Sequence, residues 1–130
     1  MAKKSTNQRK SRTSPKKTRS PQYYYKQGLT KAGHYEHEGA IGDFNKAIRL
    51  KPDFAEAYYH RGISKFELVE YEDAIADIND AIKYNPDYFQ AYAKRGEIRS
   101  LMRRRKKGSQ TVILPLVLIQ IMMKHTLSVA

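Results

Sequence analysis

Residues 55–88 read AEAYYHRGISKFELVEYEDAIADINDAIKYNPDY, and this pattern recurs along the chain at a constant spacing. Three units share a tyrosine and a glycine at that spacing: Tyr24, Tyr58 and Tyr92, and Gly28, Gly62 and Gly96. Two units share a further set in their second half: Ala40 and Ala74, Asp43 and Asp77, Ala47 and Ala81, and Pro52 and Pro86. A fixed period of about 34 residues predicts a stacked array of supersecondary units.

Each unit contains two helical patterns. Apolar residues recur every three to five positions in residues 57–68, and they form an i, i+4, i+7, i+8 stripe in residues 74–82. Pro86 ends the second helix because proline cannot continue it. Gly62 in the middle of a helix costs about 1 kcal/mol relative to alanine, so the recurrence of this glycine predicts helices too close together for a Cβ atom. The predicted helices are 22–34, 38–51, 55–68, 71–84 and 89–102.

This pattern resembles the tetratricopeptide repeat, in which an aromatic residue, a glycine, two alanines and a proline recur at fixed spacing. The residues that carry the resemblance are Tyr24, Gly28, Ala40, Ala47 and Pro52 in the first unit, Tyr58, Gly62, Ala74, Ala81 and Pro86 in the second, and Tyr92 and Gly96 in a third. The resemblance implies an all-α, right-handed solenoid of antiparallel helix pairs. It predicts one repeat over residues 21–54, a second over 55–88, and the first helix of an incomplete third over 89–102.

The resemblance also implies a function. The concave face of such a solenoid, lined by the first helices, usually binds a peptide or protein, so we expect a non-catalytic interaction scaffold. The corresponding positions are Tyr25, Leu29, Ala32, Tyr59, Ile63, Phe66, Ala93, Glu97 and Ser100. Some of these side chains are expected to pack against the neighbouring unit instead. Family members that bind acidic C-terminal peptides carry lysine, asparagine and arginine at such positions, so we do not expect that ligand here.

No residue pattern indicates an enzyme, a cofactor or a metal. The chain has no cysteine, which excludes disulfides and thiolate chemistry, and it has no glycine-rich phosphate loop. His34 and His37 are three residues apart but lack a third ligand nearby, so a simple turn is the better interpretation. The expected partner is therefore an unidentified protein or peptide. A cytoplasmic location is expected because the sequence shows neither a signal peptide nor a transmembrane span.

The net charge of +12 is concentrated in the two flanks. Residues 1–20 carry eight lysines and arginines, residues 98–130 carry seven, and neither segment contains an acid. Residues 1–20 are predicted to be a disordered basic tail because they contain too little apolar surface to fold. An alternative function is a nucleic-acid-associated protein that uses these flanks. This alternative predicts an affinity for RNA or DNA that falls steeply with salt concentration and is lost when residues 1–20 are deleted.

The repeat breaks down after residue 102. Residues 103–107 are RRRKK and residues 111–123 are TVILPLVLIQIMM, which we predict to form an irregular tail because like charges repel and Pro115 interrupts a helix. Association of residues 111–123 with a membrane surface is a second alternative, which liposome flotation with and without this segment would test. The third unit lacks its second helix, so Tyr92 and Ile98 should be partly uncovered. Self-association through this uncapped end is therefore expected.

We interpret the break as a shift of reading frame near residues 100–103, which makes the chain a fragment of a longer array. In the other frame, Met122-Met123-Lys124 force aspartate and glutamate at positions 123 and 124. The same frame permits isoleucine, alanine and aspartate at positions 109–111, which lie one repeat period after Ile75-Ala76-Asp77. Sequencing codons 98–130 should therefore show a continuing repeat in the shifted frame. A stop codon before position 110 in that frame would contradict this interpretation.

Overall fold

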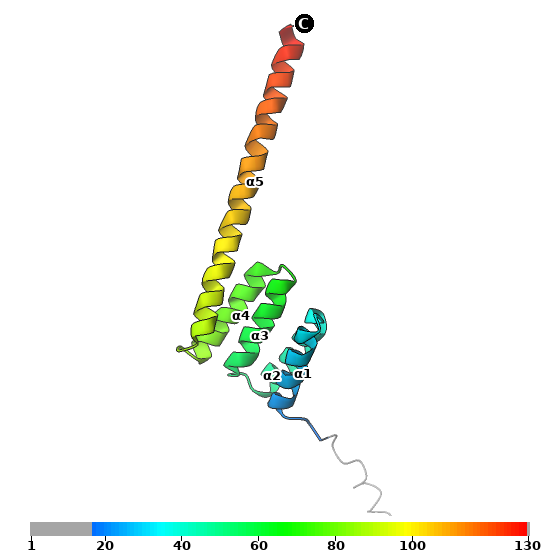
Figure 1. Cartoon of the computed structure of the whole chain (residues 1–130), viewed down its shortest axis with the longest axis vertical. Helices are drawn as coiled ribbons and strands as arrows, with labels where there is room; N and C mark the ends of the chain where they lie inside the picture. Colours follow the sequence, from blue (N-terminus) through cyan, green and yellow to red (C-terminus); the bar gives the residue numbers. More distant parts are fainter. Residues whose placement is uncertain (1–16, 130) are drawn as a thin grey trace, which may run out of the picture.

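The computed structural model describes residues 17–129, except for the side chains of 109–117 and 125–129. It contains five α-helices: α1 (Pro21–Gly33), α2 (His37–Leu50), α3 (Ala55–Glu67), α4 (Tyr71–Tyr84) and α5 (Phe89–Val129). The first four pair as α1 with α2 and α3 with α4, and α5 lies against the second pair (Figure 1). The predicted all-α stack of two complete helix pairs and one further helix is confirmed, with the predicted helix ends correct to within one residue up to α4.

The core is built from the small and apolar residues of the repeat signature. In α2 and α4 the fully buried side chains occupy equivalent positions: Ala40, Phe44 and Ala47, and Ala74, Ile78 and Ala81. Ala57 in α3 and Ala91 in α5 are buried opposite them. An alanine at such a position leaves no room for an added methylene, because a close-packed interior accommodates extra volume only by strain. The alanines of the repeat therefore set the distance between neighbouring helices.

The prediction of close approach at the glycines is confirmed in the two complete repeats. A Cβ atom on Gly28 would lie 2.6 Å from Cε1 of Phe44. A Cβ atom on Gly62 would lie 3.1 Å from both the carbonyl oxygen of Ala74 and Cγ1 of Ile78. The prediction is wrong at Gly96, where an added Cβ would meet nothing within 4 Å. Within the described residues, no second helix covers that side of α5.

The end of the predicted disordered tail is ordered. Ser20 is the N-cap of α1, where its side chain accepts a hydrogen bond of 3.2 Å from the backbone N–H of Tyr23. The guanidinium of Arg19 lies 4.3 Å from the centre of the Tyr23 ring. This N-cap stabilises one of the helix N–H groups that has no partner within the helix. The prediction of disorder is thus wrong for Arg19 and Ser20, and for residues 1–16 it lies outside the described residues.

The turns inside the two complete repeats share one unusual backbone conformation. Tyr35 and Val69, which are one repeat period apart, have φ angles of 63° and 65°. In each turn the next residue donates its backbone N–H back to the preceding helix, from Glu36 to Lys31 and from Glu70 to Lys65, both at 2.9 Å. A left-handed residue of this kind ends a helix and reverses the chain. These turns bring the second helix of each pair back against the first.

The largest departure from the sequence prediction is the course of α5. It is one helix of 41 residues, and its C-terminal half projects beyond the other four helices (Figure 1). The prediction of an irregular segment after residue 102 is wrong for residues 103–129. Lysine and arginine are good helix formers, and on an exposed helix five consecutive cations point in different directions around the axis. The loss of one backbone N–H at Pro115 does not end the helix.

Two further predictions concern the side chains of α5. Ile98 was expected to be partly uncovered, but it is fully buried in a cluster with Ala74, Ile78, Ala81 and Ala91. The prediction for Tyr92 is confirmed, because 42% of its surface is exposed. Of the apolar segment at 111–123, the described side chains from Leu118 onward are exposed, and those of 111–117 lie outside the described residues. Within the described residues, no helix has the length and apolarity that a membrane span requires.

Candidate functional site

A continuous row of aromatic rings connects the first repeat to the start of α5. The ring of Tyr25 lies 5.0 Å from that of Phe54 and 5.7 Å from that of His60. The ring of Tyr59 lies 5.0 Å from His60 and 4.9 Å from Tyr88. We call these five residues the aromatic strip. Because α1, α3 and the residue before α5 each supply a ring, the strip exists only when the repeats are stacked.

The aromatic strip is electrically neutral near pH 7. Burial raises the pKa of Tyr25 and of Tyr88, and the nearby Glu56 carboxylate adds to both effects. Burial lowers the pKa of His60 below its usual value of 6.5, against a smaller opposite effect of Glu56. Tyr25 and Tyr88 therefore keep their phenolic protons, and the imidazole of His60 is uncharged. The strip offers aromatic faces and polar O–H groups rather than a fixed charge, which suits contact with another protein.

The nine residues predicted to line the concave face fall into two groups. The six in α1 and α3 are partly buried: Tyr25, Leu29, Ala32, Tyr59, Ile63 and Phe66. The three in α5 are exposed: Ala93, Glu97 and Ser100. Tyr59 and Phe66 also pack against the buried cluster of the second repeat. These two side chains thus support the fold as well as contributing to the surface.

One contact joins the two groups. The ammonium group of Lys94 pairs with the carboxylate of Glu97 at 2.7 Å and lies 5.3 Å from the centre of the Phe66 ring. The predicted residues Phe66 and Glu97 are thereby brought together through a lysine that the sequence analysis did not select. This ion pair offsets the positive charge of Lys94. The lysine is therefore a poor candidate for binding the carboxylate of a ligand.

Sequence reasoning missed three members of the aromatic strip. It selected neither His60 nor the two residues that precede first helices, Phe54 and Tyr88. The repeat could have indicated two of them, because Phe54 and Tyr88 are aromatic residues one repeat period apart. Each directly precedes a first helix, α3 or α5. The prediction considered only positions within the first helices and so left out the residues just before them.

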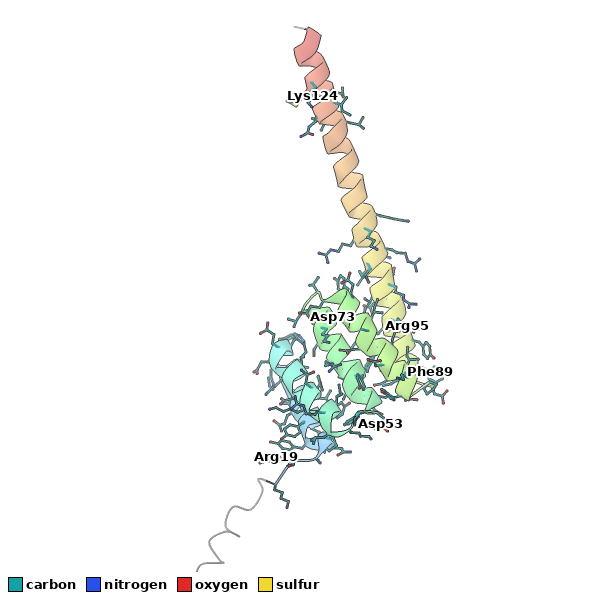
Figure 2. The ribbon with its side chains drawn as sticks, turned by 180° about the vertical axis from the view of Figure 1, so that it is seen from behind. Arg19, Asp53, Asp73, Phe89, Arg95 and Lys124 are labelled. Atoms are coloured by element: carbon teal, nitrogen blue, oxygen red, sulfur yellow. The ribbon has the colours of Figure 1, made fainter. Side chains whose placement is uncertain are left out.

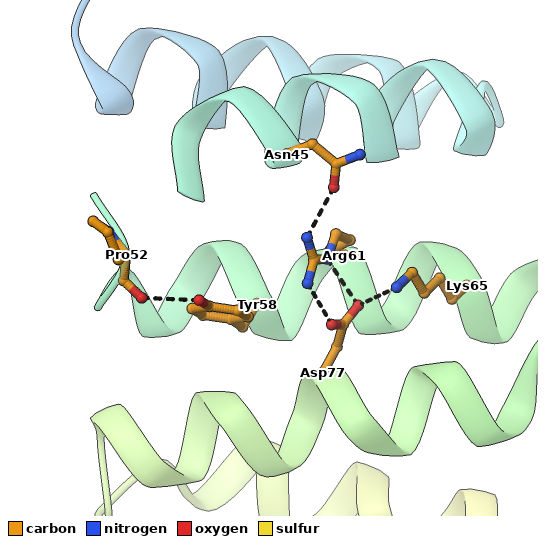
Figure 3. Close-up of polar contacts among 6 residues, drawn as sticks. All are labelled: Asn45, Pro52, Tyr58, Arg61, Lys65 and Asp77. Atoms are coloured by element: carbon orange, nitrogen blue, oxygen red, sulfur yellow. Dashed lines mark hydrogen bonds and ion pairs between the residues drawn. The ribbon is translucent and has the colours of Figure 1, made fainter. Parts of the chain in front are cut away.

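A cluster of polar side chains joins α3 to α4 within the second repeat and reaches α2 of the first repeat through one hydrogen bond. The guanidinium of Arg61 donates from Nε to Oδ2 of Asp77 at 2.9 Å and from Nη2 to Oδ1 at 2.6 Å, and its Nη1 donates to Oδ1 of Asn45 at 2.8 Å (Figure 3). Lys65 adds an ion pair of 2.9 Å to Asp77. Only 3% of Asp77 is exposed. Such a bidentate, charge-assisted contact is strong and fixes geometry, so this cluster has a structural role.

The described part of the chain contains no candidate metal site. There, no three histidine, aspartate or glutamate side chains are close enough to hold an ion. His34 hydrogen-bonds through Nδ1 to the backbone carbonyl of Thr30 at 2.8 Å. That contact belongs to the end of α1, and His37 is the first residue of α2.

Comparison with known proteins identifies the repeat. A family model described as "TPR repeat" matches residues 36–69, which span α2 and α3. The solved structure of MamA has a TM-score of 0.64 and 28% sequence identity over 67% of this chain. The chain contains a tetratricopeptide repeat (TPR). It spans about half of MamA, because the match covers 51% of that chain. No curated protein matches by sequence.

Other TPR structures share the fold. The Arabidopsis OM64 TPR domain has a TM-score of 0.61 and 26% identity, and the match covers 62% of this chain and 67% of that domain. The first TPR of Spaghetti (RPAP3), solved bound to the HSP90 peptide SRMEEVD, has a TM-score of 0.63 and 23% identity over 65% of this chain and 67% of that one. The predicted all-α TPR solenoid is confirmed by these matches together with the five helices.

Proposed function

We propose that this protein is a non-catalytic interaction module that binds a segment of another protein along the aromatic strip and the adjoining concave-face residues. The observation that carries the proposal is the strip itself, in which partly exposed rings from both repeats and from the residue before α5 form a continuous row over the buried ring of Phe54. Solenoid repeats present extended surfaces of this kind to protein partners. Tyrosine is enriched among residues that dominate binding energies, because its ring is large and its O–H can hydrogen-bond.

The chemistry of the strip favours an apolar or aromatic ligand segment. The first TPR of Spaghetti (RPAP3), a similar fold, has been solved bound to the HSP90 peptide SRMEEVD, which is acidic at its C-terminal end. In this chain the first-helix positions are occupied by residues such as Tyr25, Leu29 and Ile63, which lack a positive charge. The carboxylate of Glu56 is close enough to the strip to act on Tyr25, His60 and Tyr88. It would repel an acidic tail, so we propose a neutral or basic segment with apolar anchors.

Selection from a displayed peptide library against the full chain tests the proposal. The selected peptides should contain aromatic or aliphatic anchors, and Tyr59→Ala should weaken their binding about 30-fold, as expected for a central aromatic contact. Fluorescence anisotropy would measure the affinity, and circular dichroism would check that the variant is folded.

Two further variants control this experiment. Tyr59→Phe keeps the ring and should retain most of the affinity. Tyr35→Ala removes a tyrosine that is 86% exposed in a turn outside the strip, and it should leave binding unchanged. Equal binding by the wild type and by folded Tyr59→Ala, or a selection dominated by acidic C-terminal peptides, would contradict the proposal.

A further inference from the structure

The side of α5 that faces away from α4 lacks a cover that both complete repeats have. In α3 the side facing α4 carries Tyr58, Arg61, Gly62 and Lys65, whose contacts include the stacking of Tyr58 on Tyr84 with ring centres 5.5 Å apart. One repeat period later, α5 carries Tyr92, Arg95, Gly96 and Arg99. We call these four residues the open face. Figure 2 shows Arg95, with Phe89 near it, at the free end of the helix stack.

The open face is bare in the described structure. An added Cβ on Gly96 would meet nothing within 4 Å, whereas the equivalent atom on Gly62 would meet the backbone and side chains of α4. Tyr92 is 42% exposed, and Arg99 is exposed as well. At the glycine the helix surface is flat, which allows close approach of another backbone. Beside it, the open face carries the uncovered aromatic ring of Tyr92.

The open face also has two cations positioned as if to hold a carboxylate. In the second repeat Arg61 and Lys65 converge on Asp77, and in the first repeat Lys31 pairs with Asp43 at 2.8 Å. On α5, Arg95 keeps the equivalent bond to an asparagine, donating to Oδ1 of Asn79 at 2.9 Å. Among the side chains that the structure describes, no carboxylate pairs with Arg95 or Arg99.

The chain does not place its own following segment on this face. In the complete repeats the backbone reverses at Tyr35 and Val69. The equivalent residue of the third unit, Arg103, lies within α5, which continues as a helix to Val129. Within residues 17–129, no segment of the chain covers this face, so a helix from outside these residues can occupy it. The exposed basic run at 103–107 disfavours the α5 of a second copy and favours an acidic partner.

We propose that the open face binds an acidic amphipathic helix of a second protein, which occupies the place of the missing second helix of the third repeat. The repeats define the chemistry of this helix. It carries a small residue against Gly96, an aspartate three residues later between Arg95 and Arg99, an apolar residue next to that aspartate, and a second small residue. The same order is found in α2 and α4: Ala40, Asp43, Phe44 and Ala47, and Ala74, Asp77, Ile78 and Ala81.

A peptide with the sequence of residues 70–86, EYEDAIADINDAIKYNP, is a suitable probe because it carries this pattern. Labelled with a fluorophore and titrated with the full chain, it should bind saturably by anisotropy. Gly96→Leu should weaken binding at least about tenfold, because its side chain fills the space that the peptide backbone would occupy. Gly108→Leu is the matched control. Gly108 is also in α5 and has nothing within 4 Å, but it lies outside the open face.

The charge of the aspartate provides a second, independent test of the proposal. A peptide in which the residue corresponding to Asp77 is asparagine should bind about tenfold more weakly, and Arg99→Gln in the chain should have a similar effect. The fold-loss of affinity when both changes are combined should be smaller than the product of the two separate fold-losses, because both changes remove the same ion pair. A helix glycine with open space tolerates leucine, so Gly96→Leu should fold, as circular dichroism would verify.

Three results would overturn the proposal. The first is that the peptide does not bind. The second is that it binds the wild type and Gly96→Leu equally. The third is sedimentation that shows a dimer of the wild type which Gly96→Leu dissociates, because the open face would then already be buried between two copies. The test is independent of the proposed function, because the aromatic strip is probed with Tyr59→Ala and the open face with Gly96→Leu.

Discussion

Replacing Gly62 by leucine is expected to lower the free energy of unfolding by about 3 kcal/mol, at the upper end of typical overpacking effects. The new Cβ would lie 3.1 Å from the carbonyl oxygen of Ala74 and from Cγ1 of Ile78, and 3.3 Å from Cβ of Asp77. A backbone carbonyl cannot rotate away as a flexible side chain does, so α3 and α4 must separate. Chemical denaturation followed by circular dichroism would measure the loss.

Gly96→Leu is the matched control for this prediction. Gly96 occupies the same position in the repeat, but an added Cβ there has no neighbour within 4 Å. Its replacement should therefore leave stability unchanged or raise it by up to about 1 kcal/mol, because glycine is a poor helix former. A loss of stability at Gly96 equal to that at Gly62 would show that the glycine position matters for a reason other than helix contact.

Removing the carboxylate of Asp77 is expected to destabilise the protein by about 3 kcal/mol, because breaking a buried ion pair from one side costs about 3–5 kcal/mol when the remaining charge loses its partner. Here two cations are left, Arg61 and Lys65, whose side chains are only 18% and 20% exposed. We place Asp77→Ala at the lower end of the range because these side chains retain some access to water. The same denaturation experiment would measure it.

Two other substitutions separate charge from shape at this site. Asp77→Asn keeps the size and one of the two accepting oxygens, so it should cost less than alanine. Asp80→Ala removes an acid from the same helix that takes no part in the cluster of Figure 3, and it should change the free energy of unfolding by about 0.5 kcal/mol or less. If Asp77→Ala and Asp80→Ala behaved alike, the ion-paired cluster would not be holding α3 against α4.

The repeat period determined most of the architecture. In a solenoid each unit contacts only its neighbours, so the same contacts return at the same spacing and leave the same residues in each unit. The glycines at 28 and 62 and the alanines of α2 and α4 could therefore be placed at helix contacts from the sequence alone. The resemblance to the tetratricopeptide repeat, and not the period itself, indicated Tyr25 and Tyr59 as candidate surface residues, since both follow the repeated tyrosine by one position.

Only the tertiary structure decided what happens where the period stops. Whether Gly96 is covered, whether Ile98 is buried and whether residues 103–129 turn or continue as a helix all depend on which segment packs against α5. The repeat pattern predicts the contacts that a residue makes in a regular array of units. Where the neighbouring helix is absent, that prediction is wrong. His60 and Tyr88 joined the candidate surface through contacts of the same non-local kind. The ring of His60 meets that of Tyr25, and the ring of Tyr88 meets that of Tyr59, across helices that are brought together only when the repeats are stacked.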